Sequence, residues 1–262
     1  MRVAVLDDIH GNLPALEAVL EEVRQARVDC IVVGGDVLPG PMPRAAIACL
    51  RRLTIPVHFI YGNCEVAVLQ EAAGKIPAGV PEQHRPIIAW TADQVRGEDE
   101  RFVASWPKTL RLTIPSLGEV LFCHGTPRDE NEVFTRQTPE DLLRPLFQDS
   151  HASLVVCGHT HMQFDRMIGG VRVVNAGSVG MPFQEPGAYW LLLGPDVELR
   201  RTSYELGAAA ARIRATNYPD AENFAANYVL KPPPEAAMLE TFTTLSLNAL
   251  SLTLSLSKGE PS

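Results

Sequence analysis

The chain has 262 residues, of which 46% are hydrophobic, and its formal net charge at pH 7 is −8. This length suits one well-packed domain with an elaboration better than two domains, and the diffuse acidic charge argues against stable nucleic-acid binding. The five cysteines form no C-x-x-C pair, which indicates a reducing compartment without a disulfide framework. Because we find no signal-peptide pattern and no apolar run of the roughly 20 residues that a membrane helix needs, we expect a cytoplasmic protein with no membrane partner.

The first quarter of the chain alternates short apolar runs with amphipathic segments. We expect strands at 2–6, 30–36 and 56–61, and helices at 13–26 and 43–53. Strands and helices that alternate at this spacing are typical of βαβ units in a parallel sheet.

The middle of the chain changes character. Residues 77–107 have a mostly helical pattern and contain Trp90 and Trp106, so we expect a small helical cap inserted at about 77–117. The second half is rich in strand patterns, with a Gly-Gly hairpin turn at 168–171. These strands are expected at 110–114, 119–123, 153–157, 164–168, 171–175 and 188–194.

The domain is expected to cover residues 1–230, and a proline-rich break begins at 231. Residues 231–262 are interpreted as a low-complexity tail rich in Leu, Ser and Thr that lies outside the core fold. The alternation of Leu with polar residues leaves open an edge strand or an interaction segment instead.

Seven polar side chains follow the expected strands at the point where each strand ends. Residues just past the carboxyl ends of strands share one edge of an α/β sheet, where ligands bind. Imidazoles, carboxylates and an amide oxygen are borderline-to-hard metal ligands, and seven are too many for one tetrahedral ion. Two ions that share one carboxylate would use them all, and Asp36, after a Gly-Gly turn, is the natural bridge. The seven candidate ligands are Asp8, His10, Asp36, Asn63, His124, His159 and His161.

The charge of such a centre indicates its substrate class. Two divalent ions contribute +4, Asp8 and Asp36 remove 2, and a bridging hydroxide removes 1, so the centre keeps a charge of +1 and attracts a phosphate anion. Two-metal sites hold their ions about 3.5–4 Å apart and stabilise both the attacking and the leaving oxygen of a phosphoryl displacement.

The segments DDIHGN (7–12), GGD (34–36), GNCE (62–65), CHG (123–125) and GHTH (158–161) resemble, in order, the five motif blocks of the calcineurin-like metallophosphoesterases. The resemblance extends to about residue 203. It is greatest to small bacterial and archaeal phosphodiesterases whose third block often reads GNC. It implies an α/β (α+β) fold of four layers, in which two mixed β-sheets form a sandwich flanked by helices.

The resemblance also implies a dinuclear centre of divalent metal ions and an attacking metal-bridging hydroxide. Manganese is expected, with iron, zinc or nickel as alternatives. Asp8, His10, Asp36 and His161 would hold one ion, and Asp36, Asn63, His124 and His159 the other. Asp36, Asn63 and His124 would thus be catalytic through the metal-bound hydroxide.

Two positions depart from the family pattern. Asp7 stands where the family usually has a small residue, and it would either tune the metal or face away. Cys64 stands where related branches have the histidine that is thought to protonate the leaving oxygen. A thiol with a pKa near 8.5 is a poor substitute for imidazolium. We therefore predict a preference for activated diesters, such as aryl or 2′,3′-cyclic esters. Cys64 itself is interpreted as inert rather than redox-active.

The substrate is expected to be a small phosphate ester, most of all a phosphodiester. Cyclic nucleotides, nucleotide-derived diesters and phospholipid-derived diesters remain open, as does a homo-oligomeric state. Candidate substrate-binding residues are Asn12, Cys64 and Arg128. Capping of the first helix is the alternative for Asn12, and an ion pair with Asp129 or Glu130 is the alternative for Arg128. A weakly active or inactive scaffold on the same fold is the competing function.

Other candidates have structural interpretations. His58, His84 and His151 belong to no motif and are assigned to core, cap or solvent contacts. Cys123 and Cys157 end apolar strands and are expected to pack in the core, as are the two tryptophans of the cap. The segment AGSVG (176–180) lacks the first glycine of a nucleophile elbow, which argues against a serine hydrolase.

Overall fold

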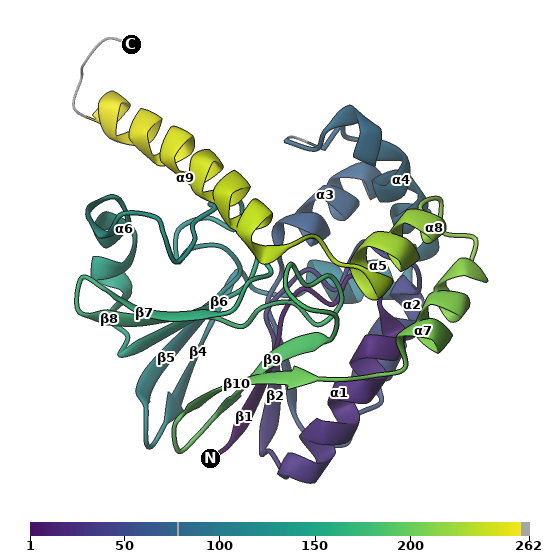
Figure 1. The fold of residues 1–262 in the computed structure, drawn as a ribbon, viewed down its shortest axis with the longest axis horizontal. Helices are drawn as coiled ribbons and strands as arrows, with labels where there is room; N and C mark the ends of the chain where they lie inside the picture. Colours follow the sequence, from purple (N-terminus) through teal and green to yellow (C-terminus); the bar gives the residue numbers. More distant parts are fainter. Residues whose placement is uncertain (78, 258–262) are drawn as a thin grey trace.

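In the computed structural model, which describes residues 1–77 and 79–257, two five-stranded mixed sheets form the centre of the molecule (Figure 1). The first sheet has the order β10-β9-β1-β2-β3, with β1, β2 and β3 mutually parallel and β9 antiparallel to both of its neighbours. This confirms the βαβ units expected near the N-terminus. The strands are β1 (Val3–Leu6), β2 (Cys30–Val33), β3 (Val57–Phe59), β9 (Ala188–Leu193) and β10 (Val197–Thr202).

The second sheet has the order β4-β5-β6-β8-β7, and its central strands β5, β6 and β8 are parallel. The hairpin between β7 and β8 turns at Gly169 and Gly170, whose φ angles of 57° and 88° confirm the expected two-residue turn. The strands are β4 (Thr109–Ile114), β5 (Gly118–Cys123), β6 (Leu154–Cys157), β7 (Phe164–Ile168) and β8 (Val171–Asn175).

The helices cover the outer faces of both sheets. Helix α1 packs against the first sheet, and its buried apolar residues Leu16, Val19 and Val23 face the core, as their spacing predicts. The second sheet is covered by α6. The helices are α1 (Leu13–Ala26), α2 (Pro43–Arg51), α3 (Asn63–Ala72), α4 (Arg85–Gln94), α5 (Glu98–Ala104), α6 (Glu140–Phe147), α7 (Leu206–Arg214), α8 (Ala221–Phe224) and α9 (Glu235–Ser257), with short 3-10 turns at Glu82–His84 and Gln148–Ser150 and a π-helical segment at Ala225–Leu230.

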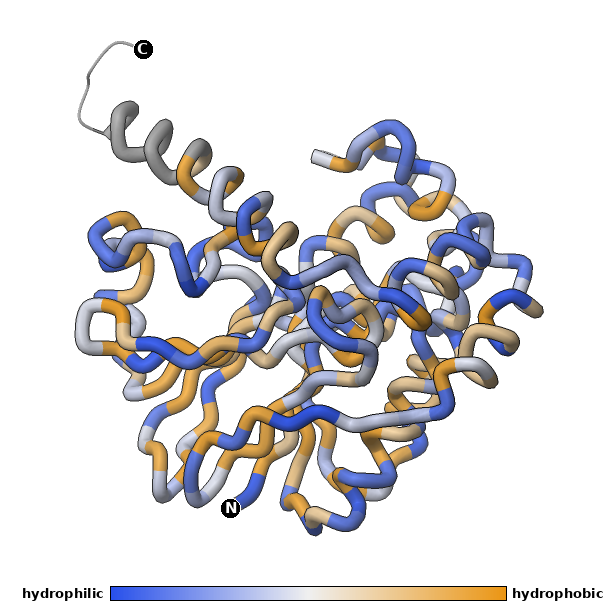
Figure 2. Tube along the Cα trace, viewed as in Figure 1, coloured by the Kyte–Doolittle hydropathy of each residue, from blue (hydrophilic) through white to orange (hydrophobic). Residues whose placement is uncertain are grey.

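The inner faces of the two sheets pack against each other. Val5 and Leu191 of the first sheet share one buried cluster with Phe122 and Val156 of the second. Figure 2 shows hydrophobic segments along the strands of both sheets. The four-layer sandwich flanked by helices is therefore confirmed, and its interior fixes how the ends of the strands of the two sheets face one another.

The helical insertion is shorter than the range 77–117. Its helical part ends with α5, and Thr109–Ile114 is β4, an edge strand paired with β5, as the strand pattern at 110–114 predicted. The two tryptophans pack as expected: Trp106 stacks on Phe59 at 4.8 Å between ring centroids, and Trp90 meets Tyr218 edge-on at 5.3 Å. The helices α4 and α5 lie against α2 and α3.

The C-terminal segment is a helix over the part that the structure describes, so the edge-strand alternative was wrong, and its first half is not outside the fold. Leu239 is 5% exposed, Thr243 bonds Thr135 between their Oγ1 atoms at 2.7 Å, and Ser246 accepts a hydrogen bond from Thr138. Leu is a strong helix former, but the alternation of Leu with polar residues in this segment is also typical of a strand. Figure 1 shows α9 projecting from the body beyond these contacts. Among the described residues, no helix combines the length and apolarity that crossing a membrane requires. Residues 258–262 of the expected tail lie outside the described residues.

Candidate metal centre

The seven candidate ligands come together where the parallel strands of both sheets end. Asp8 and His10 follow β1, Asp36 follows β2, and Asn63 begins α3 after β3. His124 directly follows β5, and the two histidines of the GHTH segment follow β6. Because the sandwich aligns these two sheet edges, loops from five separate segments meet at one site, as the strand positions predicted.

The backbone at this site is held in an unusual conformation. Seven described non-glycine residues have positive φ angles, and five of them are candidate ligands, with φ between 46° and 67°. Such conformations cost roughly 1–3 kcal/mol each and persist where the surrounding structure over-determines them, as it does at functional sites. The five are Asp8, His10, Asp36, His159 and His161.

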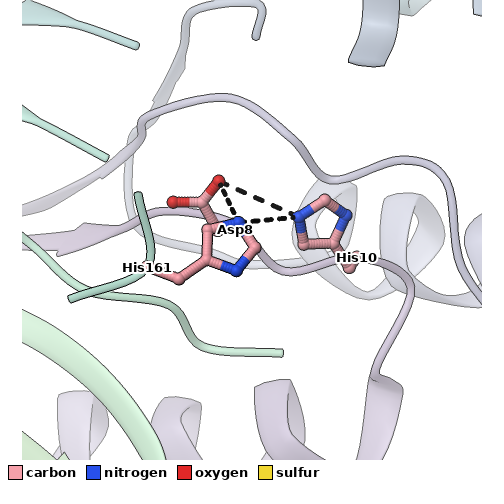
Figure 3. Close-up of side chains that lie close together, drawn as sticks. All are labelled: Asp8, His10 and His161. Atoms are coloured by element: carbon pink, nitrogen blue, oxygen red, sulfur yellow. Dashed lines mark hydrogen bonds and ion pairs between the residues drawn. The ribbon is translucent and has the colours of Figure 1, made fainter. Parts of the chain in front are cut away.

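Three of the ligands form a first group around Asp8. Asp8 Oδ1 lies 3.2 Å from His161 Nε2 and 3.9 Å from His10 Nε2, and the two Nε2 atoms are 3.2 Å apart. Figure 3 shows the carboxylate and the two rings turned toward one another. Asp8 Oδ1 is buried and has no hydrogen-bond partner among the described residues. A buried, unpartnered carboxylate oxygen that faces two imidazole nitrogens fits a cation.

The second group forms around Asp36 and His124. His124 Nε2 lies 3.4 Å from Asp36 Oδ2 and 3.1 Å from Asn63 Oδ1. One ligand atom each from Asp36, His124 and His159 lies within 4.8 Å of the others. The same Asp36 Oδ2 is 3.8 Å from His10 Nε2, so this oxygen lies between the two groups. Its other oxygen accepts the backbone N–H of Cys64 at 3.0 Å, which fixes the orientation of the carboxylate.

Backbone carbonyls orient two of the imidazoles for ligation through Nε2. His161 Nδ1 lies 2.6 Å from the carbonyl oxygen of Met181, and His124 Nδ1 lies 3.0 Å from that of Gly34. A carbonyl can only accept, so each Nδ1 carries the proton and donates it. The Nε2 atom, which faces the carboxylates, is then the atom left to bind a metal.

The electrostatics also fit bound cations. Burial lowers the pKa of His10 and of His159 to about 4, with His161 and His124 respectively adding to the effect, so both rings are neutral and able to ligate at pH 7. Burial would also lower the pKa of His124, but the carboxylates of Asp36 and Asp8 outweigh it and raise the pKa to about 10. The carboxylates thus already attract a positive charge to this position.

Asp7 is a buried carboxyl group directly before the candidate ligand Asp8 in the chain. It is 1% exposed, and a side chain at Gly34 or Gly158 would collide with its carboxylate or its Cβ. Burial first, and then the charge of Asp8, raise the pKa of Asp7 well above its ordinary value, which favours the protonated carboxyl group. The two glycines therefore make room for this extra carboxyl group.

Cys64 lies beside the centre. Its Sγ is within 4.8 Å of ligand atoms of His10 and Asp36. Burial and the neighbouring Asp36 carboxylate raise the pKa of the thiol well above its ordinary value, which disfavours a reactive thiolate. The structure thus brings Cys64 to the position expected from the motif.

The other two candidate substrate-binding residues do not reach the centre as free side chains. Asn12 is fully buried, accepts the N–H of Ala15 as the cap of α1 and donates to the carbonyl of Gly180 at 2.9 Å, so the capping alternative is confirmed and the substrate-binding role does not fit. Arg128 is exposed and pairs with Glu132, two residues beyond Glu130, rather than with Asp129 or Glu130.

One residue that organises the site was missed from the sequence. Glu65 is fully buried, and its carboxylate accepts the backbone N–H groups of Asp36 at 2.8 Å, Leu38 at 2.9 Å and Gly62 at 2.7 Å. It therefore ties the loop after β2 to the loop after β3. The available signal was a glutamate three residues after Gly62 at the start of a helix, the spacing of a capping interaction.

Comparisons with known proteins agree with this arrangement. The sequence profile of the calcineurin-like phosphoesterase superfamily domain matches residues 1–194. The chain is 26% identical over 239 residues to the uncharacterized protein MJ0912 of Methanocaldococcus jannaschii, covering 83% of this chain and 94% of that protein. It is 30% identical over 203 residues to the phosphodiesterase YfcE of Escherichia coli K12, covering 73% and 87% respectively.

A solved structure of a metallophosphoesterase from Sphaerobacter thermophilus superposes with a TM-score of 0.68 at 26% identity and covers 87% of this chain and 99% of that one. The matched profile includes every one of the seven candidate ligands, the last of which is His161. This chain therefore belongs to the calcineurin-like phosphoesterase superfamily.

Proposed function

We propose that this protein hydrolyses phosphodiesters with the help of two divalent metal ions. The observation that carries the proposal is the division of the candidate ligands into two groups that meet at Asp36 Oδ2. Asp8, His10 and His161 would hold one ion together with Asp36. Asn63, His124 and His159 would hold the other together with the same carboxylate.

The residues present fit such ions in number, type and orientation. Bound divalent ions would supply positive charge to a phosphate group and lower the pKa of a coordinated water. Two ions contribute +4 and the two carboxylates −2, so the site attracts anions although the chain carries −8. The backbone carbonyls of Met181 and Gly34 hold the imidazoles in place, and Glu65 holds the two loops that carry Asp36 and Asn63.

A diester rather than a monoester substrate is supported by two observations. YfcE, of which this chain covers 87%, is a phosphodiesterase. The side chain at position 64 is a thiol of raised pKa, and no imidazolium is available from this position to protonate a leaving oxygen. We infer that substrates with good leaving groups are preferred and that manganese is the working metal, with iron, zinc or nickel as alternatives.

Hydrolysis of bis-p-nitrophenyl phosphate and p-nitrophenyl phosphate tests the proposal. Chelator-stripped protein should be inactive, and added Mn²⁺ should restore activity that is higher on the diester. Asp36→Asn should abolish it, whereas Asp141→Asn, the same change at an exposed carboxylate of α6, should not. Equal or higher activity on the monoester would contradict the diester preference. Tight metal uptake without hydrolysis of either ester would favour the scaffold function.

A further inference from the structure

A cavity of about 340 Å³ opens beside the candidate metal centre. His10, Asn63 and Cys64 line the end nearest the centre. The other walls are mostly apolar and come from the helical insertion, the loop before β9 and the segment after α7. They include Val80, Ile87, Met181, Phe224 and Tyr228. We refer to this space as the side cavity. Its volume is at the lower end of the range of small-molecule sites.

The wall that faces the insertion is built from connected aromatic rings. Tyr218 and Phe224 meet edge-on with centroids 6.0 Å apart, and Phe224 lies 5.6 Å from Tyr228. Tyr228 is in turn 6.5 Å from Phe183, whose ring stacks on the candidate ligand His161 at 4.7 Å. These contacts hold the rings in fixed positions beside the centre. Fixed aromatic surfaces favour planar apolar ligands.

The charges of the side cavity select against a second anionic group. Among the described residues that line it, the charged side chain is Asp220, and there is no lysine or arginine. The other lining residues with polar groups away from the centre are His84, Asn223 and the two tyrosines, Tyr218 and Tyr228. An additional phosphate placed here would face a carboxylate without a compensating cation, whereas an uncharged planar group would meet apolar walls and a few hydrogen-bonding groups.

The aromatic wall is a property of this chain beyond the shared family domain. The family profile matches residues 1–194, and Tyr218, Phe224 and Tyr228 come after it. The opposite wall, with Ile87, belongs to the helical insertion. Figure 1 shows α4 of the insertion and α8 of the later segment on the same side of the molecule.

We propose that the side cavity binds an uncharged substituent of the phosphodiester that carries a planar ring, either a nucleoside or a simple aryl group. The inference rests on the proposed function, because it places the phosphate at the candidate ligands and the substituent against Tyr228 and Ile87. It also gives the helical insertion the role of setting substrate choice.

The test uses three p-nitrophenyl diesters that share a leaving group and differ in the second substituent: methyl, phenyl and thymidin-5′-yl. Since one methylene in an apolar pocket changes kcat/KM by roughly 10-fold or more, the Mn²⁺-loaded protein should prefer the phenyl or thymidinyl ester over the methyl ester by at least about 10-fold. Tyr228→Ala and Ile87→Ala, one from each wall, should each reduce this ratio. Leu199→Ala, at an apolar residue of β10 that is 47% exposed, should leave it unchanged.

A higher kcat/KM for the thymidinyl ester than for the phenyl ester assigns a nucleoside, and the reverse order assigns an aryl group. Equal kcat/KM for all three esters, unaffected by correctly folded variants, would overturn the proposal. If no ester is hydrolysed with any metal, the proposed function fails. Binding of the intact esters then still tests whether the side cavity recognises the second substituent. Equilibrium dialysis with chelator-stripped protein should then show tighter binding of the phenyl or thymidinyl ester than of the methyl ester, weakened by Tyr228→Ala, and equal binding would overturn it.

Discussion

Glu65 joins the loop after β2 to the loop after β3, and its substitution tests whether these hydrogen bonds organise the metal centre. Glu65→Gln keeps the shape of the side chain but replaces one acceptor oxygen with a donor. In the structure Oε2 accepts from Asp36 and Gly62, and Oε1 accepts from Leu38. Whichever way the amide is turned, at least one buried N–H loses its acceptor and faces another donor.

The expected loss in the free energy of unfolding follows from this count. A buried donor left unsatisfied costs about 1–3 kcal/mol, so Glu65→Gln should lose about 1–3 kcal/mol. Glu65→Ala leaves all three N–H groups unsatisfied and opens a cavity, so it should lose about 3 kcal/mol or more. For a protein of this size, each 1 kcal/mol lowers Tm by roughly 2–4 °C.

Urea-induced unfolding of the chelator-stripped proteins measures this loss. Glu71→Gln makes the same change on the same helix, α3, at a half-buried side chain, and should stay within about 0.5 kcal/mol of the parent. Glu65→Gln should also bind metal roughly 10–100-fold more weakly, as expected for a group that orients a ligand. If Glu65→Gln and Glu71→Gln have equal stability and equal metal affinity, the hydrogen bonds of Glu65 do not organise the site.

Substitutions at three further positions test single features of the site. Cys64→Ser should change kcat on activated diesters by far less than the roughly 10²–10⁴-fold that a general acid contributes. Cys64→His should flatten the dependence of kcat on the pKa of the leaving group. If kcat of the parent protein already shows no such dependence, the reasoning is contradicted. Phe183→Ala should cost about 3–5 kcal/mol in unfolding free energy and weaken metal binding, because its buried ring stacks on His161; unchanged metal affinity would show that the ring does not position the ligand. Asn12→Ala should lower stability by about 0.5–2 kcal/mol through the lost cap while KM for bis-p-nitrophenyl phosphate stays constant, and a raised KM would return Asn12 to the substrate site.

Most of what could be predicted about the fold and the site followed from where the strands end in the sequence. Polar residues that interrupt apolar runs lie where a strand ends, so the sequence positions of Asp8, Asp36 and His124 predict one shared edge of the sheets. The hairpin at 168–171 was predictable for a related reason, since two successive glycines adopt the positive φ angles that a tight turn needs.

Side-chain partners that depend on how loops and distant segments fold could not be predicted in the same way. Arg128 had several acidic residues within reach along the chain, and the choice of Glu132 depends on how the loop folds. The segment beyond residue 231 offered both a period of two and a high helix propensity, and its contacts through Thr135 and Thr138 come from more than 100 residues away. The side cavity likewise depends on two segments that only the folded chain brings together.

Central to the proposed function is that diester hydrolysis needs two metal ions, which share the carboxylate of Asp36 as a ligand. The most direct measurement is a titration of chelator-stripped protein with Mn²⁺, in which bound metal per chain and hydrolysis of bis-p-nitrophenyl phosphate are followed together. We predict two bound ions per chain, with activity that rises as the second ion binds. Activity that is complete at one ion per chain, or a chain that binds no more than one, would contradict the claim.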